Sequence, residues 1–337
     1  MFSKLDANQL RQNLQGIDFL LSGVQPSVEL GAEAAQNYAA YKRDYGLNFS
    51  ELDPNLKAAK STVGTFSSGN YELVCQHFLS STQAPRKTAF LLHGYLDHAG
   101  LYRHLIKHLL ERDIAVIIFD LPGHGLSSGA TASISSFQDY SAAFVACLKL
   151  AKQQLASPWL TIGQSTGAAI IMDMLLEKRL EKELAKDISL QDFILLGPLL
   201  RPKQWRRSKV MFSFIRLFAA STPRKFSKNS HDAEFLDFIK NKDELQSRIL
   251  PREWVLAMMD YINRFEGSPR HEQSLQIIQG RGDGTVDWEK NIPKIVEKFP
   301  GSTLHFVDEA GHHLVNESVH YREQVFALID RILGISV

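Results

Sequence analysis

One pentapeptide constrains the fold of this chain more than any other segment: Gly-Gln-Ser-Thr-Gly at residues 163–167. The apolar run Trp159–Ile162 precedes it, and the segment Ala168–Leu180, whose apolar residues have helical spacing, follows it. This order predicts a strand, a sharp turn and a helix in immediate succession. The glycines permit the turn because they lack side chains, and the hydroxyl of the central Ser165 is expected to project from it.

Short apolar runs and helical segments alternate on both sides of this turn. A continuous apolar run such as Ile114–Phe119 is typical of a strand buried on both faces. The expected strands are Thr62–Ser67, Tyr71–Leu79, Thr88–Leu92, Ile114–Phe119, Trp159–Ile162, Phe193–Leu196, Leu275–Gln279 and Leu304–Val307. Strands that alternate with helices predict an α/β fold, with a mostly parallel central sheet and helices on both faces.

Two segments interrupt this alternation. Residues 1–60 are polar and helical in pattern, with Tyr38, Tyr41 and Tyr45 at helical spacing, and we expect an N-terminal extension packed on the main domain. Residues 201–270 form a charged insertion that we expect to be helical and call the cap segment. The α/β core is then expected in residues 61–200 and 271–337.

Composition excludes several classes of protein. The chain has 38 Lys and Arg against 37 Asp and Glu, whereas a dedicated nucleic-acid binder usually carries a basic excess. Its first residues lack the apolar stretch of a signal peptide, and no apolar run approaches the length of a membrane span, so we expect a cytoplasmic protein. Cys75 and Cys147 make neither a disulfide framework nor a zinc motif, and we expect both to be buried and reduced.

A serine hydroxyl at such a turn becomes a nucleophile when a histidine accepts its proton and a carboxylate orients that histidine. In this kind of fold the carboxylate and then the histidine follow the serine along the chain. Asp283 lies in a glycine-rich loop directly after the expected strand Leu275–Gln279, which favours it as the carboxylate. Asp287 is the competitor, but it precedes a helix and an N-cap role would account for it.

The candidate base follows the last expected strand. His312 comes directly after Gly311 in the loop, whereas His313 begins the C-terminal helical run, so we favour His312. Other histidines lie within expected strands or helices and are interpreted as surface or packing residues: His104, His108, His305 and His320.

Two backbone N–H groups are expected to stabilise the oxyanion that forms when the serine attacks a carbonyl. One belongs to Thr166, the residue after the nucleophile. The other belongs to Tyr95, because Gly94 allows the backbone of the preceding loop to approach closely.

Four stretches resemble the α/β-hydrolases of the monoacylglycerol lipase and lysophospholipase group, which is also grouped with serine aminopeptidases. Residues 93–102 resemble the group's His-Gly-x-x-Glu-His-x-x-x-Tyr segment, and residues 120–127 are similar to its Asp-x-x-Gly-His-Gly-x-Ser loop. Residues 163–167 look like its nucleophile elbow and residues 310–317 like its terminal histidine segment. The resemblance implies Ser165, Asp283 and His312 as the triad, Tyr95 and Thr166 at the oxyanion hole, and no metal or organic cofactor.

The elbow departs from the group's usual Gly-His-Ser-Met-Gly-Gly. Gln164, Thr166 and Ala168 replace the histidine, the methionine and a glycine, which alters the floor of the acyl site without removing a catalytic atom. We expect Gly94 and Gln164 to contact the substrate. The reaction expected from the resemblance is hydrolysis of a monoacyl lipid ester, either a lysophospholipid or a monoacylglycerol, through an acyl-enzyme.

An unusually basic stretch leads into the cap segment and continues through its first part. Residues 193–231 carry nine Lys and Arg and no Asp or Glu. Apolar residues at helical spacing run through it: Val210, Met211, Phe214, Ile215 and Phe218. A basic, apolar lid would suit a phosphate-bearing amphiphile or contact a membrane surface, with Arg206 and Arg207 as candidate headgroup contacts. The alternative is a lid helix that covers the active site and whose charges are only solvated.

Three rival functions remain open. A thioesterase or a small-ester hydrolase could use the same triad. A peptidase that binds free amino termini would need acidic residues in the lid, which the basic stretch does not supply, although residues 234–244 contain some. A catalytically silent binding module would not require Ser165, Asp283 and His312 together.

Overall fold

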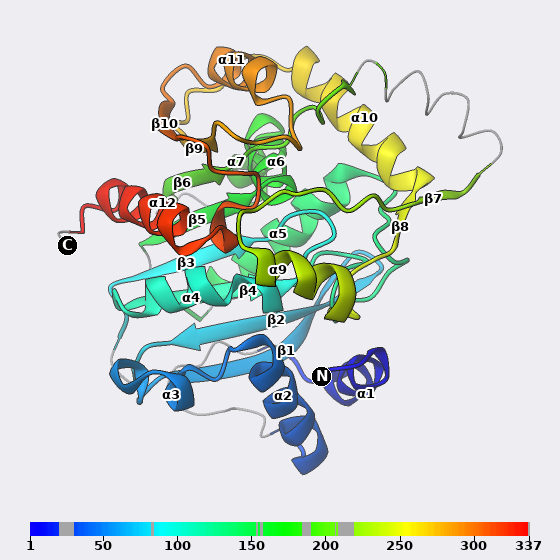
Figure 1. The fold of residues 1–337 in the computed structure, drawn as a ribbon, viewed down its shortest axis with the longest axis vertical. Coiled ribbons are helices and arrows are strands. Elements are labelled where there is room, and N and C mark those ends of the chain that lie inside the picture. The colour runs from blue at the N-terminus through cyan, green and yellow to red at the C-terminus, as the bar shows by residue number, and fades with distance from the viewer. Residues whose placement is uncertain are drawn as a thin grey trace.

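Eight strands form one sheet in the order β1-β2-β4-β3-β5-β6-β9-β10 (Figure 1). The computed structural model describes residues 1–19, 30–81, 84–152, 154–155, 158–183, 190–205, 207 and 219–335. The strands are β1 (Lys60–Ser68), β2 (Tyr71–Leu79), β3 (Lys87–Leu92), β4 (Ile114–Phe119), β5 (Trp159–Gln164), β6 (Leu190–Leu196), β9 (Gln276–Gly280) and β10 (Thr303–Val307). The predicted α/β fold is confirmed.

The sheet is antiparallel at one edge and parallel elsewhere. β1 and β2 form the predicted hairpin, in which Ser68 lies opposite Tyr71, and β2 runs antiparallel to β4. The remaining neighbours are parallel, so the carboxyl ends of β3, β5, β9 and β10 lie at the same edge of the sheet. The loops that carry the predicted site residues follow these four ends.

Helices cover both faces because alternate side chains of each buried strand point to opposite sides. Phe90 and Leu92 of β3 join the core beneath α5 (Phe137–Lys152), α6 (Thr166–Leu176), α10 (Arg252–Gly267) and α11 (Trp288–Lys298). Ala89 and Leu91 join the core beneath α4 (Arg103–Leu110) and α12 (Val319–Ile332). The short helices are α3 (Phe49–Leu52), η1 (Pro54–Leu56), η2 (Ala99–Tyr102), α7 (Arg179–Glu183) and η4 (Leu314–Asn316).

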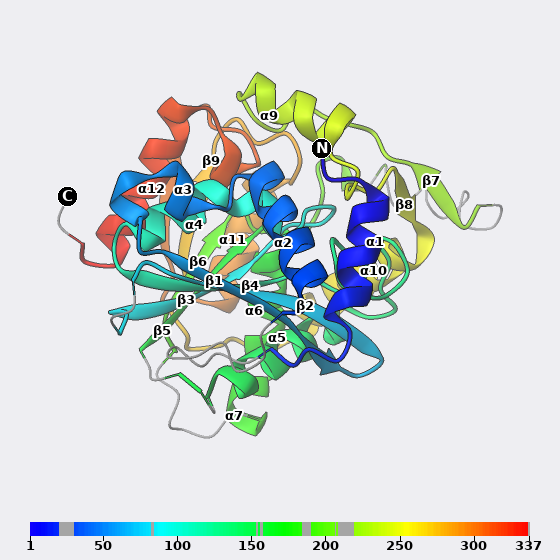
Figure 2. The same cartoon turned by 90° about the horizontal axis from the view of Figure 1, so that it is seen from below.

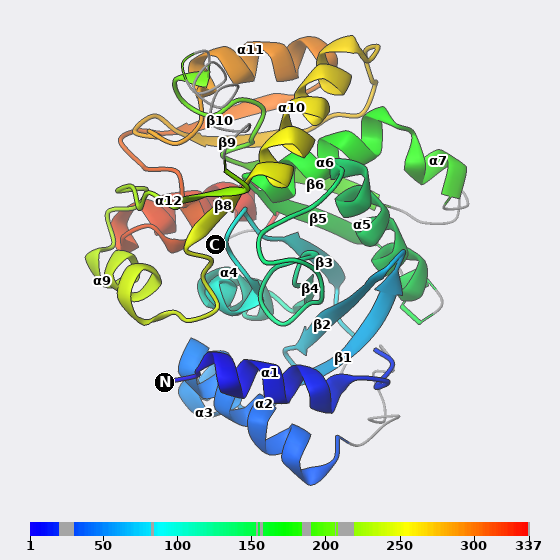
Figure 3. The ribbon, with the colours of Figure 1, turned by 90° about the vertical axis from the view of Figure 1, so that its right-hand side faces the viewer.

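The first residues of the chain pack on the α4 face of the sheet. α1 (Lys4–Leu14) and α2 (Ala32–Tyr45) lie beside each other next to the β1–β2 hairpin, as Figure 2 and Figure 3 both show. The tyrosines at helical spacing, Tyr38, Tyr41 and Tyr45, are all buried. Because these rings share one core with α4 and β4, the N-terminal residues are part of the folded unit.

The described part of the cap segment contains strands as well as the expected helices. It contains α9 (Ala233–Asp237), the π-helix η3 (Phe238–Lys242) and α10, but also two short antiparallel strands, β7 (Ser221–Pro223) and β8 (Ile249–Pro251). Each strand ends in a proline, which disfavours helix at the residue before it, and Thr222 and Ile249 are β-branched. These local preferences produce the hairpin-like pair.

α10 is tied to the core by charge. Arg264 forms ion pairs with Asp173 of α6 and with Glu177, which follows α6.

Cys75 and Cys147 are both buried and free, as expected. Within the described part of the chain, no helix combines the length and the apolar character needed to cross a membrane.

Candidate active site

Ser165 occupies the turn between β5 and α6 in a strained backbone conformation. Its φ is 54° and its ψ is −107°, in the region that costs a non-glycine residue about 1–3 kcal/mol. The flanking glycines are required by close packing. A Cβ at Gly163 would lie 2.5 Å from the carbonyl carbon of Gly167, and one at Gly167 would lie 2.0 Å from the oxygen of Leu92 in β3.

The three predicted side chains are joined by two successive hydrogen bonds. His312 Nε2 accepts a hydrogen bond from Ser165 Oγ at 2.9 Å, and His312 Nδ1 donates one to Asp283 Oδ2 at 2.7 Å. All three residues are buried. Burial alone would lower the pKa of His312, but the charge and hydrogen bond of Asp283 outweigh it, and the pKa is raised. The imidazole is therefore poised to accept a proton from Ser165.

Asp283 is held by its own loop. Its Oδ1 accepts hydrogen bonds from the backbone N–H of Thr285 at 2.8 Å and of Val286 at 3.1 Å, and Gln279 Nε2 donates to its Oδ2 at 3.1 Å. Burial would raise the pKa of Asp283, yet His312 and the two backbone N–H donors lower it, so the carboxylate stays ionised beside the imidazole.

Asp287 does not compete for the histidine. It stands at the N-cap of α11, as expected, but its carboxylate makes no bond to the helix N–H groups. It accepts instead from Lys290 Nζ at 2.7 Å. The predicted N-cap position is confirmed, and the side chain there pairs with Lys290 one helical turn away.

His313 belongs to a separate network that holds the loop after β3. Its Nε2 donates to Asp97 Oδ2 at 3.0 Å, and the Tyr102 hydroxyl donates to the same oxygen at 3.2 Å. Tyr102 in turn accepts from the backbone N–H of Gly94 at 2.9 Å. Sequence reasoning did not identify Asp97, although it occupies the acidic position of the His-Gly-x-x-Glu-His pattern.

This network holds the loop that carries Tyr95, one of the two predicted oxyanion donors, close to Ser165. A Cβ at Gly94 would lie 3.6 Å from the Ser165 Cβ, so the loop passes close to the serine. Tyr95 is fixed by its hydroxyl, which donates to the oxygen of Ala132 at 2.7 Å, and by its ring, which stacks on Trp254 of α10 at 3.6 Å. Thr166 is the first residue of α6, so its N–H has no acceptor within the helix.

Gln164 supports the histidine as well as lining the cavity. Its Nε2 donates to the backbone oxygen of His312 at 2.9 Å. Its Oε1 is buried without a hydrogen-bond partner, like Thr166 Oγ1 nearby and Asn229 Oδ1 in the cap segment. All three residues line the same cavity.

The cavity beside Ser165 and His312 has a volume of about 210 Å³ and runs beneath the cap segment. Its apolar wall includes Leu199, Ile239, Trp254 and Val286. Among the described residues, Arg224 and Lys225 supply the basic charge of its lining. An enclosed, mainly apolar space next to a nucleophile suits an acyl group.

Of the two basic residues singled out from the sequence, Arg207 is described, and it is not part of the cavity lining. Arg206 and the apolar positions from Val210 to Phe218 lie outside the described residues, and Arg207 is exposed. Arg224 and Lys225 belong to the same basic stretch. No sequence pattern predicts β7, the strand that directly precedes them and orients them toward the cavity.

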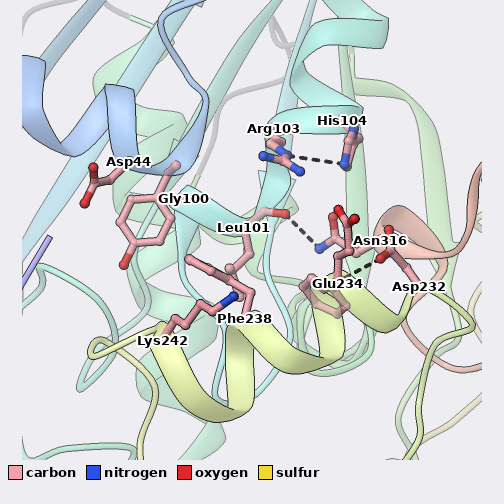
Figure 4. Close-up of a pocket in the computed structure, with 12 residues that line it drawn as sticks. Asp44, Gly100, Leu101, Arg103, His104, Asp232, Glu234, Phe238, Lys242 and Asn316 are labelled. Carbon is pink, nitrogen blue, oxygen red and sulfur yellow. Dashed lines mark hydrogen bonds between the residues drawn. The ribbon is translucent and has the colours of Figure 1, made fainter. Parts of the chain in front are cut away.

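A second cavity, of about 250 Å³, lies between α2, the start of α4 and the α9–η3 segment (Figure 4). His104 is its histidine and accepts a hydrogen bond from Arg103 Nε at 3.3 Å. Burial, with the charges of Arg322 and Arg103, lowers the pKa of His104 to about 3. Its described lining includes no serine, threonine or cysteine, so this cavity lacks the nucleophile that the first one has.

Comparison with known families agrees with this geometry. The profile of the family described as serine aminopeptidase, S33, matches residues 83–319. An uncharacterized abhydrolase domain-containing protein of Dictyostelium discoideum is 23% identical over 270 residues, which is 76% of this chain and 27% of that protein. The monoglyceride lipase of Homo sapiens is 30% identical over 103 residues, 30% of this chain and 33% of that protein. The chain spans about a third or less of the length of these curated relatives.

Solved structures share the fold. A soluble variant of monoglyceride lipase from Saccharomyces cerevisiae superimposes with a TM-score of 0.68 and 15% identity, covering 81% of this chain and 94% of that one. The monoacylglycerol lipase of Paleococcus ferrophilus gives a TM-score of 0.62 and 16% identity, covering 82% and 100%. At these identities the likeness shows the fold.

Proposed function

The chain belongs to the serine aminopeptidase S33 family of α/β-hydrolases, and from this premise we propose that it hydrolyses carboxylic esters of monoacyl lipids. The observation that carries the proposal is the hydrogen-bonded line Ser165–His312–Asp283 at the wall of a cavity with apolar lining. The substrate is a lysophospholipid or a monoacylglycerol.

The reaction has two steps on this geometry. His312 Nε2 takes the proton from Ser165 Oγ as the oxygen attacks the ester carbonyl, and the resulting imidazolium gives that proton to the departing alcohol. Water, activated by the same nitrogen, then releases the fatty acid from the acyl-enzyme and restores the serine. Asp283 orients His312 and stabilises its charged form in both steps.

The tetrahedral intermediates place negative charge on the former carbonyl oxygen. The backbone N–H groups of Tyr95 and Thr166 are the proposed donors to that oxygen. The N-terminus of α6 adds partial positive charge at the same point. Because the Asp97 network and the Trp254 stack hold the Tyr95 loop in place, these donors need little rearrangement during the reaction.

The cavity favours an ester over a peptide with a free amino terminus. Recognition of an ammonium group would need a carboxylate that is free to pair with it. Among the described residues of the lining, Asp97 is the acidic one, and its Oδ2 already accepts from His313 and Tyr102. A thioesterase or small-ester hydrolase would use the same residues, and acyl-chain length separates these from the lipid proposal.

Two measurements test the proposal. A fluorophosphonate probe is expected to label the wild type and not Ser165→Ala, and equal labelling of both proteins would refute the assignment of the nucleophile. A series of glycerol esters with increasing acyl length is expected to give the highest kcat/KM at medium or long chains. Activity confined to acetyl and butyryl esters would refute the lipid substrate.

A further inference from the structure

Two guanidinium groups lie over one phenylalanine, Phe226, at the cap-side wall of the catalytic cavity. The guanidinium of Arg224 lies 4.3 Å from the ring centroid of Phe226, and that of Arg248 lies 5.1 Å from the same centroid. The backbone N–H of Arg224 donates to the oxygen of Arg248 at 2.9 Å, because the two residues extend the β7–β8 pair. With Lys225, these residues make up what we call the Arg224 cluster.

The cluster has no counter-ion within the part of the chain that the structure describes. Arg224 Nη1 donates to the neutral oxygens of Gln246 and of Ser247, the latter at 3.3 Å, and Arg248 Nη1 donates to the oxygen of Lys240. Burial and the charge of Arg248 lower the pKa of Arg224, and the charges of Asp97 and Asp243 only partly offset them. Like charges held together without an anion repel each other, and a bound anion would relieve that repulsion.

Part of the cluster borders the same cavity as the nucleophile. Arg224, Lys225 and Phe226 line it together with Ser165 and His312. Asp97, the acidic residue of the described lining, forms no ion pair with Arg224, and its Oδ2 accepts hydrogen bonds from His313 and Tyr102. The cap-side wall therefore presents positive charge that is only partly compensated, in the cavity that holds Ser165.

We propose that the Arg224 cluster binds an anionic group of the substrate, and that the preferred ester is a lysophospholipid with its phosphate on the cap side. This inference rests on the proposed ester hydrolysis and selects one of its two substrate classes. A guanidinium recognises phosphate through paired N–H donors, which a neutral glycerol headgroup does not satisfy equally.

The test compares two esters with the same acyl chain, lauroyl glycerol and lauroyl glycerol phosphate, each below its micellar concentration. The wild type is expected to show a kcat/KM at least about tenfold higher for the phosphate ester. Arg224→Gln is expected to lower that ratio about tenfold, and Arg224→Lys to lower it less because the charge is kept. Lys228→Gln is the matched control, since Lys228 is exposed in the same basic stretch but does not line the cavity.

The outcomes separate the inference from the proposed function. An unchanged ratio in Arg224→Gln, or an equal fall in Lys228→Gln, would overturn the inference. A wild type that hydrolyses both esters equally, and is inhibited competitively by inorganic phosphate, would assign the cluster to a free anion and also overturn it. In each of these cases the hydrolysis of lauroyl glycerol still supports the proposed function, whereas no hydrolysis of either ester and no probe labelling would refute both. Thermal unfolding of each variant shows whether a lost ratio reflects a lost fold.

Discussion

Two buried histidine–aspartate pairs in this molecule have similar hydrogen bonds but different surroundings. His312 donates to Asp283 at 2.7 Å, and His98 donates from Nε2 to Asp243 at 3.0 Å. Each pair has a hydroxyl neighbour, Ser165 in the first and Tyr45 in the second. In both, burial lowers the histidine pKa and the partner carboxylate more than compensates, so the pKa of each is raised.

The difference lies in what the second ring nitrogen contacts. His312 Nε2 faces the Ser165 hydroxyl at the wall of a cavity, so a proton can pass between them and on to a ligand. His98 Nδ1 accepts from the backbone N–H of Gly100 at 3.2 Å, and the Tyr45 hydroxyl donates to Asp243 Oδ1 at 2.9 Å. Both nitrogens of His98 are occupied, and this second pair is a fixed joint between α2, the loop after β3 and the cap segment.

The largest expected contrast comes from removing each imidazole. His312→Ala is expected to lower kcat/KM for a preferred ester by at least about 10³-fold with little change in thermal unfolding. His98→Ala is expected to do the reverse, destabilising the protein because Asp243 is left buried without its partner. Steady-state kinetics and urea unfolding of both variants provide the check, and similar kinetic losses would show that the two pairs are not distinct in role.

The pH profile should follow His312 alone. Only its neutral form can accept the serine proton, and its pKa is raised above 6.5, so kcat/KM is expected to rise with pH through that elevated pKa. Asp283→Asn removes the charge that raises the pKa, so the acidic limb should move to lower pH while the plateau falls by roughly 10³–10⁴-fold. Profiles of kcat/KM from pH 5 to 9 decide this, and an unmoved limb would assign it to another group.

Asp243→Asn is expected to weaken the fixed joint while leaving the reactivity of Ser165 unchanged. The carboxylate accepts hydrogen bonds on both oxygens, from His98, Tyr45 and the N–H of Leu245, and an amide nitrogen would set a donor against at least one of these donors. The expected cost is about 1–3 kcal/mol of unfolding free energy. Urea unfolding measures it, with fluorophosphonate labelling expected at the wild-type rate below the unfolding transition.

Tyr45→Phe is the mildest change and isolates the contribution of α2. It removes one donor while Asp243 Oδ1 keeps the N–H of Leu245, so we expect a loss of about 1 kcal/mol or less. An effect larger than that of Asp243→Asn would contradict this ranking, because phenylalanine keeps the ring that packs against His98 at 4.9 Å and only the hydroxyl is lost.

The residues around Ser165 could be predicted because local rules place them. Ser165, Asp283 and His312 each follow a strand of the parallel sheet, and parallel strands bring their carboxyl ends to one edge. The fixed joint could not be predicted in this way. Tyr45 and Asp243 are 198 residues apart, and only the packing of α2 against the cap segment brings them together.

The cap segment shows a second limit. Its helical pattern concealed β7 and β8, whose three-residue lengths are too short for an alternation of apolar residues to be visible. Charge counting located the basic stretch but selected Arg206 and Arg207, whereas the β7–β8 pair brings Arg224 and Arg248 to the same ring. The distribution of charge along the sequence locates a basic segment, but the pairing of β7 with β8 determines which of its side chains meet.

The backbone of Ser165 has a consequence for how such a protein can change over time. Its positive φ is comfortable for glycine and unfavourable for every other residue, so the position sacrifices some folding stability to keep a hydroxyl at the turn. A population selected for heat tolerance alone would gain from replacing that serine with glycine and would lose the nucleophile in the process. The hydroxyl at this turn is therefore held at the expense of the local backbone preference.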